Sequence, residues 1–192
     1  MNIGIDFDDV ITEFTETLMN YYHKKHGKKV TLDQILIWDW RIYWEIPKQE
    51  AIKRVDDFHE SHKVTELPPL KDAISSLNEI IKNNKVFIIT GRPTRFKNKV
   101  EEWLKHHLKK KLEIIHAGEF HKGQAATKAE ICKELNIPIM IEDTGETALD
   151  CTKEGIQIIL FNKPWNKNFK HHNILRVENW NEALKMINKI TK

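Results

Sequence analysis

Three carboxylates stand close together near the start of the chain, in the stretch IGIDFDDVIT. Asp6, Asp8 and Asp9 follow directly on an apolar run that predicts a buried strand. Like charges at this spacing repel one another and shift one another's pKa values, so a plain strand end gives no reason to collect them. A bound cation that neutralises them is the first interpretation.

Polar residues also follow the later apolar runs. Thr90 and Gly91 come directly after VFII. Glu142 and Asp143 come after IPIMI, and Lys128 opens the helical segment KAEICKEL. Because ligands of open parallel sheets bind at the carboxyl ends of the strands, we expect these groups to share one crevice. Carboxylates favour a hard cation such as Mg²⁺, which is commonly held together with phosphate oxygens, so the combination indicates phosphoryl chemistry.

Strand-like apolar runs alternate along the chain with segments that carry apolar residues at helical spacing. This alternation predicts an α/β fold: a Rossmann-like parallel sheet with helices on both faces. The expected strands are residues 3–7, 85–90, 112–115, 139–142, 156–161 and 174–177. The expected helices are residues 72–83, 93–107, 125–136, 145–154 and 180–189.

The connection between the first two expected strands is far longer than a crossover helix needs. We therefore expect a small helical cap, residues 15–66, inserted after the first strand. The remaining residues, 1–14 and 67–192, form the expected catalytic core. The cap ends at LPPL, where paired prolines predict a hinge.

The composition excludes several classes of protein. The chain has 192 residues, of which 40% are hydrophobic and 31% charged, which suits one good core. Its apolar runs are too short to span a membrane, and its two cysteines show no metal or disulfide spacing. The net charge of +3 is mild. We expect a cytoplasmic protein.

In chain order, DFDDVIT, IITGRP, the lysine of TKAEICKEL and IMIEDTGETALD resemble the four motifs of the haloacid dehalogenase (HAD) superfamily of phosphohydrolases. One class of HAD caps is inserted between the first two motifs, and LFNKPWN resembles a segment found in relatives of the 5'(3')-deoxyribonucleotidases. Asp9 stands where many members have Gly, which Asp tolerates because it visits left-handed conformations. The acidic motif is Glu-Asp, so Asp143 is the better expected metal ligand and Glu142 the weaker.

The resemblance implies a Mg²⁺-dependent phosphomonoester hydrolase that works through a covalent intermediate. Asp6 attacks the phosphorus and forms an aspartyl-phosphate. Asp8 protonates the leaving oxygen and then activates the hydrolytic water. Mg²⁺ is bound by Asp6, the backbone carbonyl of Asp8 and Asp143.

The resemblance also implies a phosphate-binding set. Thr90 and the Gly91 amide bind phosphate oxygens, and Lys128 stabilises charge on the transferring group. Lys122 is a rival for the role of Lys128, because some relatives carry a lysine in the loop before this helix.

Four aromatic residues crowd the segment IWDWRIYW: Trp38, Trp40, Tyr43 and Trp44. A small cap does not need this much aromatic area for its own core, so part of it is expected to face the crevice and stack on a nucleobase. The expected substrate is therefore a (deoxy)nucleoside monophosphate. The alternative is that these side chains only hold the cap together. In a strand or helix Trp38 and Trp40 would diverge, which limits how many of the four can line the site.

Three other functions are alternatives to the nucleotidase. Another small phosphate monoester would serve the same site, and a nucleic-acid end would suit the basic run KHHLKKK at 105–111. A receiver module, which accepts a phosphoryl group without hydrolysing an external substrate, requires an Asp after a third central strand. The only candidates, Asp56 and Asp57, lie in a charged helical pattern. We favour a small-molecule partner over nucleic acid or a membrane, and leave homo-oligomer formation open.

The histidines offer weaker signals. His23 and His26 are spaced as a helical metal pair, but no third ligand is evident, so solvated positions are expected. His116 and His121 flank a loop near the crevice and are expected at its surface.

Overall fold

The computed structural model describes residues 1–108, 110–117 and 126–191. Its centre is a sheet in which every pair of neighbouring strands is parallel, in the order β3-β2-β1-β4-β5-β6. The strands are β1 (Asn2–Ile5), β2 (Lys85–Thr90), β3 (Glu113–His116), β4 (Ile139–Glu142), β5 (Gln157–Phe161) and β6 (Ile174–Val177). The predicted parallel α/β architecture is confirmed.

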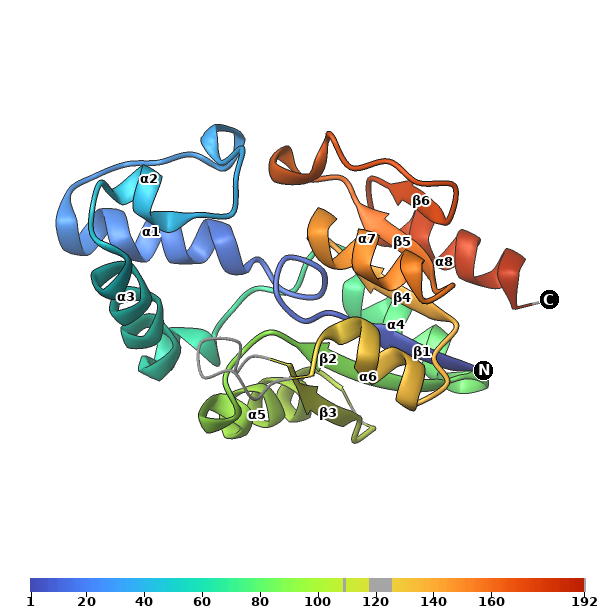
Figure 1. The fold of residues 1–192 in the computed structure, drawn as a ribbon. Coiled ribbons are helices and arrows are strands. Elements are labelled where there is room, and N and C mark those ends of the chain that lie inside the picture. Colours follow the sequence, from blue (N-terminus) through green and yellow to red (C-terminus); the bar gives the residue numbers. More distant parts are fainter. Residues whose placement is uncertain (109, 118–125, 192) are drawn as a thin grey trace.

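Helices cover both faces of the sheet (Figure 1). They are α4 (Ala73–Asn83), α5 (Lys97–His107), α6 (Lys128–Glu134), α7 (Gly145–Lys153) and α8 (Trp180–Ile190). Alternate strand residues point to opposite faces. Ile139 and Ile141 pack into the apolar cluster under α4, α5 and α8, whereas Met140 packs into the cluster under α6 and α7. The period-two pattern of the strands therefore produces two cores.

Several element boundaries differ from the sequence prediction, three of them beside the expected crevice. β1 ends at Ile5 rather than Phe7, so the carboxylates that follow lie in a loop. The helix expected from residue 93 begins with a short 3₁₀ turn, Thr94–Phe96, before α5 starts. α6 begins at Lys128 rather than residue 125, because Thr127 forms a reciprocal capping box with Glu130.

The long connection after β1 is helical, as predicted. It contains α1 (Phe14–His26), α2 (Trp40–Trp44), α3 (Lys48–Glu60) and two 3₁₀ turns, η1 (Leu32–Gln34) and η2 (His62–Val64). These helices stand beside the sheet layers in Figure 1. We call residues 15–66 the insertion; its boundaries stay a prediction.

The two ends of the insertion lie side by side. Thr12 pairs with Pro69 in an antiparallel bridge. Leu70 N donates to Ile11 O at 2.8 Å, and Glu13 N donates to Pro68 O at 2.9 Å. The expected hinge LPPL is thus hydrogen-bonded to the segment that enters the insertion.

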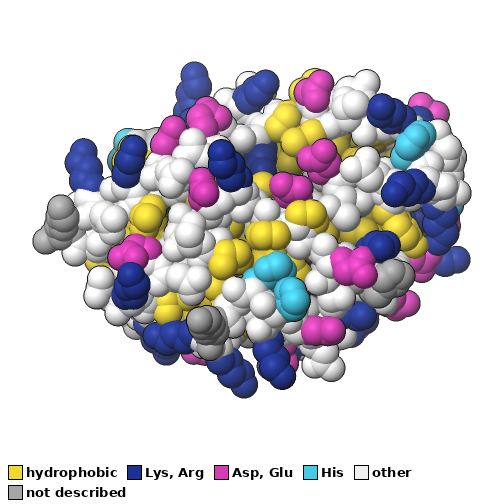
Figure 2. Space-filling view, turned by 180° about the vertical axis from the view of Figure 1, so that it is seen from behind, with side chains coloured by type: hydrophobic (Ala, Val, Ile, Leu, Met, Phe, Trp, Pro, Cys, Tyr) yellow, Lys and Arg dark blue, Asp and Glu magenta, His cyan; other side chains and the backbone are white. Residues whose placement is uncertain are grey.

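The surface carries charges of both signs. Figure 2 shows acidic and basic side chains interspersed over one face of the molecule. Within the described part of the chain, no helix combines the length and the apolar character that a membrane crossing requires.

A buried tryptophan fixes the loop after β1 and the end of the insertion to α5. The Trp103 ring meets Phe7 edge to face, with ring centroids 5.1 Å apart. Its indole Nε1 donates to the carbonyl of Leu67 at 2.8 Å. The Trp103 side chain is fully buried, so both contacts are shielded from water.

We therefore expect Trp103→Ala to lower the free energy of unfolding by about 3–5 kcal/mol, because it creates a large cavity and removes the hydrogen bond to Leu67. Urea unfolding followed by circular dichroism measures the change. Trp38→Ala is the control: Trp38 is 43% exposed, and its removal should cost much less. Equal losses in the two variants would contradict this account of Trp103.

Candidate active site

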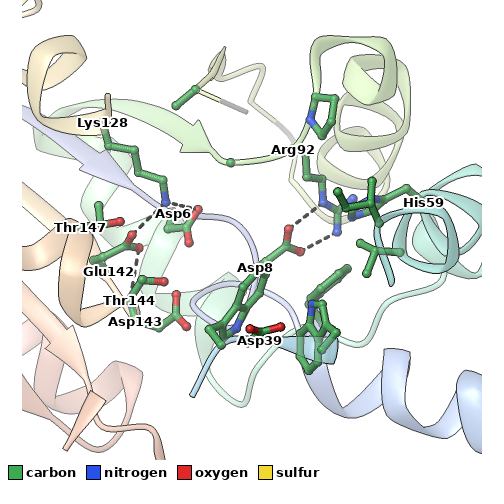
Figure 3. Close-up of a pocket in the computed structure, with 18 of the residues that line it drawn as sticks. Asp6, Asp8, Asp39, His59, Arg92, Lys128, Glu142, Asp143, Thr144 and Thr147 are labelled. Atoms are coloured by element: carbon green, nitrogen blue, oxygen red, sulfur yellow. Dashed lines mark hydrogen bonds and ion pairs between the residues drawn. The ribbon is translucent and has the colours of Figure 1, made fainter. Parts of the chain in front are cut away.

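A cavity of about 780 Å³ lies between the carboxyl ends of the central strands and the insertion (Figure 3). The core contributes acidic and basic side chains and the Gly91 backbone, whereas the insertion contributes aromatic and apolar side chains together with the charged residues Asp39, Arg41, Lys48 and Asp56. The lining includes Asp6, Asp8, Gly91, Arg92, Lys128, Glu142 and Asp143 from the core and Trp38, Trp40, Ala51, Ile52, Val55 and His59 from the insertion. Most of the predicted site residues therefore meet in one place.

Three buried carboxylates meet at the end of β1 and β4. Asp6, Glu142 and Asp143 each offer an oxygen atom, and these atoms lie within 4.8 Å of one another. The grouping follows from strand pairing: Ile5 and Ile141 are partners in the parallel ladder, so the residues after them are neighbours. The Asp6 amide also donates to the Ile141 carbonyl at 2.9 Å.

Lys128 is the counter-ion of this cluster. Its Nζ lies 2.8 Å from Asp6 Oδ1 and 3.0 Å from Glu142 Oε1. Burial lowers the pKa of Lys128, but the two carboxylates outweigh burial and raise it above its ordinary value, so Lys128 stays protonated. Burial raises the pKa of Glu142 well above its ordinary value, and Asp6 adds to this rise while Lys128 opposes it.

Asp143 is held in place from the segment after β5. Trp165 Nε1 donates to Asp143 Oδ2 at 3.0 Å, and Asn166 Nδ2 donates to the Asp143 carbonyl at 2.6 Å. Burial, followed by the charges of Glu142 and Asp6, raises the pKa of Asp143 well above its ordinary value. The LFNKPWN segment, which carried part of the family resemblance, thus orients this carboxylate.

Asp8 has a separate partner that sequence reasoning missed. Arg92 donates from Nε to Asp8 Oδ2 at 2.8 Å and from Nη2 to Asp8 Oδ1 at 2.6 Å. Burial raises the pKa of Asp8, and Arg92 opposes the rise. The signal was present, because Arg92 directly follows Gly91 in the motif IITGRP.

The geometry expected for the first motif needs correction. The strand expected over residues 3–7 would turn Asp6 and Asp8 to one face and Phe7 to the other, because alternate strand residues point to opposite faces. Phe7 is buried in the core and both carboxylates line the cavity, but the strand ends before them. Their side chains therefore reach different partners, Lys128 and Arg92.

Asp9 adopts the left-handed conformation that its replacement of Gly suggested, with φ of 56°. Its carboxylate accepts hydrogen bonds from the backbone amide of Thr15, at 3.0 Å, and from the Thr15 hydroxyl. Burial raises the pKa of Asp9 to about 6, and Lys163 opposes the rise. Asp9 therefore joins the loop after β1 to the start of the insertion.

The residues expected to bind phosphate lie at the end of β2. A Cβ placed on Gly91 would meet no described atom within 4 Å, so the space beside this backbone is open. Thr90 is buried, and its Oγ1 accepts the Arg92 amide at 3.2 Å. Among the described residues, the cavity lining includes Gly91 but not Thr90. Their roles in phosphate binding stay a prediction.

The aromatic cluster is divided between the cavity and the insertion. Trp38 and Trp40 line the cavity, with ring centroids 5.1 Å apart. The expectation that they diverge was wrong, because a bend precedes α2 and Asp39 caps this helix just before Trp40. Trp44 instead stacks on Tyr22 at 4.3 Å and holds the insertion together.

The remaining candidates lie elsewhere. His23 and His26 are exposed, as expected. His116 is partly buried rather than at the surface, and its Nδ1 lies 2.9 Å from the Arg92 carbonyl. Lys122 and His121 lie outside the described residues. Asp56 and Asp57 lie in α3 rather than after a strand, which contradicts the receiver alternative.

Solved structures share this fold over almost the whole chain. The haloacid dehalogenase-like family hydrolase SP0104 from Streptococcus pneumoniae matches with a TM-score of 0.68 at 15% identity, over 97% of each chain. A HAD family hydrolase from Deinococcus radiodurans R1 matches with a TM-score of 0.69 at 11% identity, over 99% of this chain and 96% of that one. The fold and its acidic strand ends define a HAD-type phosphohydrolase, an enzyme that hydrolyses phosphoric monoesters.

A family model assigns the chain to a narrower class than the HAD superfamily. The chain belongs to the family of 5' nucleotidase, deoxy (Pyrimidine), cytosolic type C proteins (NT5C), which it matches over residues 1–192. The nucleotidase CA_C3379 of Clostridium acetobutylicum is 26% identical over 99% of this chain and 95% of its own length. The protein YqfW of Bacillus subtilis is 28% identical over 98% of this chain and 94% of its own length.

The charge balance around Lys128 predicts a pH-dependent loss of stability. Lys128→Met should lower the free energy of unfolding by about 3–5 kcal/mol at pH 8, because it leaves buried carboxylates without their counter-ion. Because the pKa of Glu142 is already raised, this carboxyl binds more protons in the folded protein than in the unfolded chain above pH of about 4.5. Stability then falls as pH rises, and removing Lys128 steepens the fall.

Urea unfolding in a chelating buffer at pH 5 and pH 8 measures this effect. The matched control is Lys133→Met on the same helix, where the lysine is 69% exposed and pairs with Glu154. Lys133→Met should lower the free energy of unfolding by less than about 1 kcal/mol at either pH. A loss for Lys128→Met that does not grow between pH 5 and pH 8 contradicts the assignment of Lys128 as counter-ion.

Proposed function

We propose that this enzyme is a Mg²⁺-dependent nucleotidase that removes phosphate from (deoxy)nucleoside monophosphates through an aspartyl-phosphate on Asp6. One observation carries the proposal: the carboxylates of Asp6 and Asp8 share a cavity with the indole rings of Trp38 and Trp40. A phosphate over Asp6 and a flat base against the insertion would both fit this arrangement.

The chemistry divides between the two carboxylates. An oxygen of Asp6 attacks the phosphorus while the bond from phosphorus to the leaving oxygen breaks, and Asp8 gives its proton to that oxygen. Water then attacks the phosphorus, Asp8 takes the water's proton, and the bond to Asp6 breaks to release phosphate. Burial raises the pKa of Asp8, which suits a group that must carry a proton near neutral pH.

The donor set fits a divalent cation. Three buried carboxylates against one ammonium leave a net charge of minus two when all are ionised. Oxygen ligands of this kind favour Mg²⁺. We assign Asp6, Asp143 and the carbonyl of Asp8 as ligands, as the family resemblance implies, and Glu142, which lies 3.0 Å from Lys128 Nζ, as the weaker ligand. When bound, the ion would reduce the repulsion between the nucleophile and an anionic phosphate.

The phosphate end of the substrate faces fixed donors. Lys128 lies beside Asp6 and supplies positive charge, and Gly91 offers open space beside its backbone. The structural relative from Deinococcus radiodurans R1 was solved with bound phosphate and sodium, which supports phosphate chemistry on this fold.

The other end of the cavity suits a base. Trp38 and Trp40 face it together with the apolar side chains of Ala51, Ile52 and Val55 on α3. Stacking of a base on an aromatic ring contributes about 1–3 kcal/mol. Membership of a nucleotidase family supports the same substrate class.

A nucleic-acid end is less well supported as a substrate. The basic run begins in the last turn of α5, and its described residues are absent from the cavity lining. The Lys110 ammonium instead approaches the carbonyl of Ile81 at 3.5 Å. These lysines are therefore not placed to guide a polyanion to Asp6.

The nucleophile is tested by Asp6→Asn. This variant should lower kcat at least about 10³-fold with every substrate, because an amide is neither a nucleophile nor an anionic metal ligand. Phosphate release from p-nitrophenyl phosphate with excess Mg²⁺ measures it. Asp33→Asn removes the same charge at an exposed position and should keep full activity. EDTA should abolish wild-type turnover, and added Mg²⁺ should restore it. Full activity of Asp6→Asn would contradict the covalent mechanism.

Base stacking is tested by Trp38→Ala. Its KM for a nucleoside 5'-monophosphate should rise about 5- to 150-fold, the equivalent of 1–3 kcal/mol. Its KM for ribose 5-phosphate, which lacks only the base, should change much less. Ile37→Ala alters an exposed apolar neighbour outside the cavity lining and is the matched control.

The same assay runs on wild-type enzyme across nucleotides, sugar phosphates and phosphoamino acids. If ribose 5-phosphate is hydrolysed as efficiently as the nucleotides, and Trp38→Ala affects both substrates alike, the nucleotidase assignment is wrong. The assignment as a phosphatase would still hold.

A further inference from the structure

His59 is a buried histidine on the cavity side of α3. It is 5% exposed, and both of its ring nitrogens lack a hydrogen-bond partner among the described residues. The imidazole lies between two aromatic rings, with centroids 5.3 Å from Phe14 and 5.0 Å from Phe96. Aromatic packing therefore fixes the ring, and His59 lines the cavity with both of its ring nitrogens buried and unpaired in the described part of the chain.

Arg92 presents a second unpaired group beside it. Nε and Nη2 are committed to Asp8, whereas Nη1 is buried and has no partner in the described part of the chain. The guanidinium carbon lies 5.4 Å from the centroid of the Phe14 ring, the ring on which His59 stacks. His59 and Arg92 thus both line the cavity and both adjoin the Phe14 ring, and each has buried nitrogen atoms without a partner among the described residues.

This part of the cavity lies on the leaving-group side of the site. In Figure 3, Lys128 and Glu142 lie on one side of Asp8, and Arg92 and His59 lie on the other. If Asp8 protonates the leaving oxygen, the atoms beyond it belong to the group that departs rather than to the phosphate.

The chemistry of the two groups selects what can bind. Burial, together with the charges of Arg92 and Arg95, lowers the pKa of His59 well below its ordinary value, so the imidazole is neutral. A neutral imidazole offers one donor and one acceptor, whereas a guanidinium only donates. Asp8 already balances the charge of Arg92, so the pair does not require an anion. A hydroxyl group, which donates and accepts at once, satisfies both.

We propose that His59 and Nη1 of Arg92 form a subsite that binds a hydroxyl group of the leaving group. The hydroxyl donates to an imidazole nitrogen and accepts from Nη1. In the nucleotidase proposed above, on which this assignment of the leaving group rests, the hydroxyl belongs to the ribose or deoxyribose. His59 is then a specificity-determining residue supplied by the insertion.

The test pairs a change in the enzyme with a change in the substrate. We would measure kcat/KM for a nucleoside 5'-monophosphate and for its 2',3'-dideoxy analogue, with wild-type enzyme and with His59→Phe. Phenylalanine keeps the stacked ring and removes both nitrogens. The wild-type enzyme should prefer the hydroxylated substrate at least about tenfold, because the analogue leaves buried groups unpaired. His59→Phe should reduce this preference at least about tenfold.

Two variants serve as controls. His59→Gln keeps a donor and an acceptor and should retain part of the preference. His23→Phe makes the same substitution at an exposed site and should behave as the wild type does. Thermal unfolding of each variant confirms that the fold is intact.

Two outcomes overturn the subsite: a wild-type enzyme that does not distinguish the two substrates, or a His59→Phe variant that loses the same factor on both. If nucleotides are not substrates, the same comparison is made with ribose 5-phosphate and its 2,3-dideoxy analogue. A preference that depends on His59 there supports the subsite although the nucleotidase assignment has failed, and no preference overturns the subsite too.

Discussion

Negative charge buried at the ends of β1 and β4 is the constraint on which the rest of the site depends. Parallel pairing of these strands forces Asp6 together with Glu142 and Asp143, so the sheet that stabilises the core also creates the repulsion. Lys128 can reach this cluster because the Thr127 capping box starts α6 at that residue. A local helix-capping signal thus determines which lysine balances the charge of the site.

The two carboxylates assigned to the chemistry have different counter-ions. Asp6 pairs with Lys128, whereas Asp8 pairs with Arg92. Distinct environments allow neighbouring carboxyl groups to take distinct roles, one as an ionised nucleophile and the other as a proton carrier. The core therefore supplies the counter-ions of Asp6 and Asp8, and the insertion supplies aromatic, apolar and charged side chains to the same cavity.

The sequence predicted the site residues that lie at the ends of strands and helices. It missed the partners that only tertiary contacts bring to them. Asp6, Asp8, Lys128 and Asp143 each sit at the end of a periodic segment, so topology alone placed them together. The contact between Arg92 and Asp8 spans 84 residues, so the motif IITGRP places Arg92 near the crevice but does not identify its partner. His59 lies four residues after Val55 on the apolar face of α3, but the sequence gave no sign that both of its ring nitrogens lack a partner. The error on Trp38 came from assuming regular structure across a bend.

The insertion is not an independent lid, because its first residue, Thr15, is hydrogen-bonded to the loop after β1. Asp9 accepts hydrogen bonds from Thr15, and Phe14 contacts both His59 and Arg92 through its ring. The apolar residues of the insertion also form one continuous cluster with the core under α4, α5 and α8. A displacement of α1 would therefore act on the loop that carries Asp6 and Asp8 and on the ring that supports Arg92. In the proposed scheme, recognition of the leaving group and positioning of its proton donor therefore share one set of contacts.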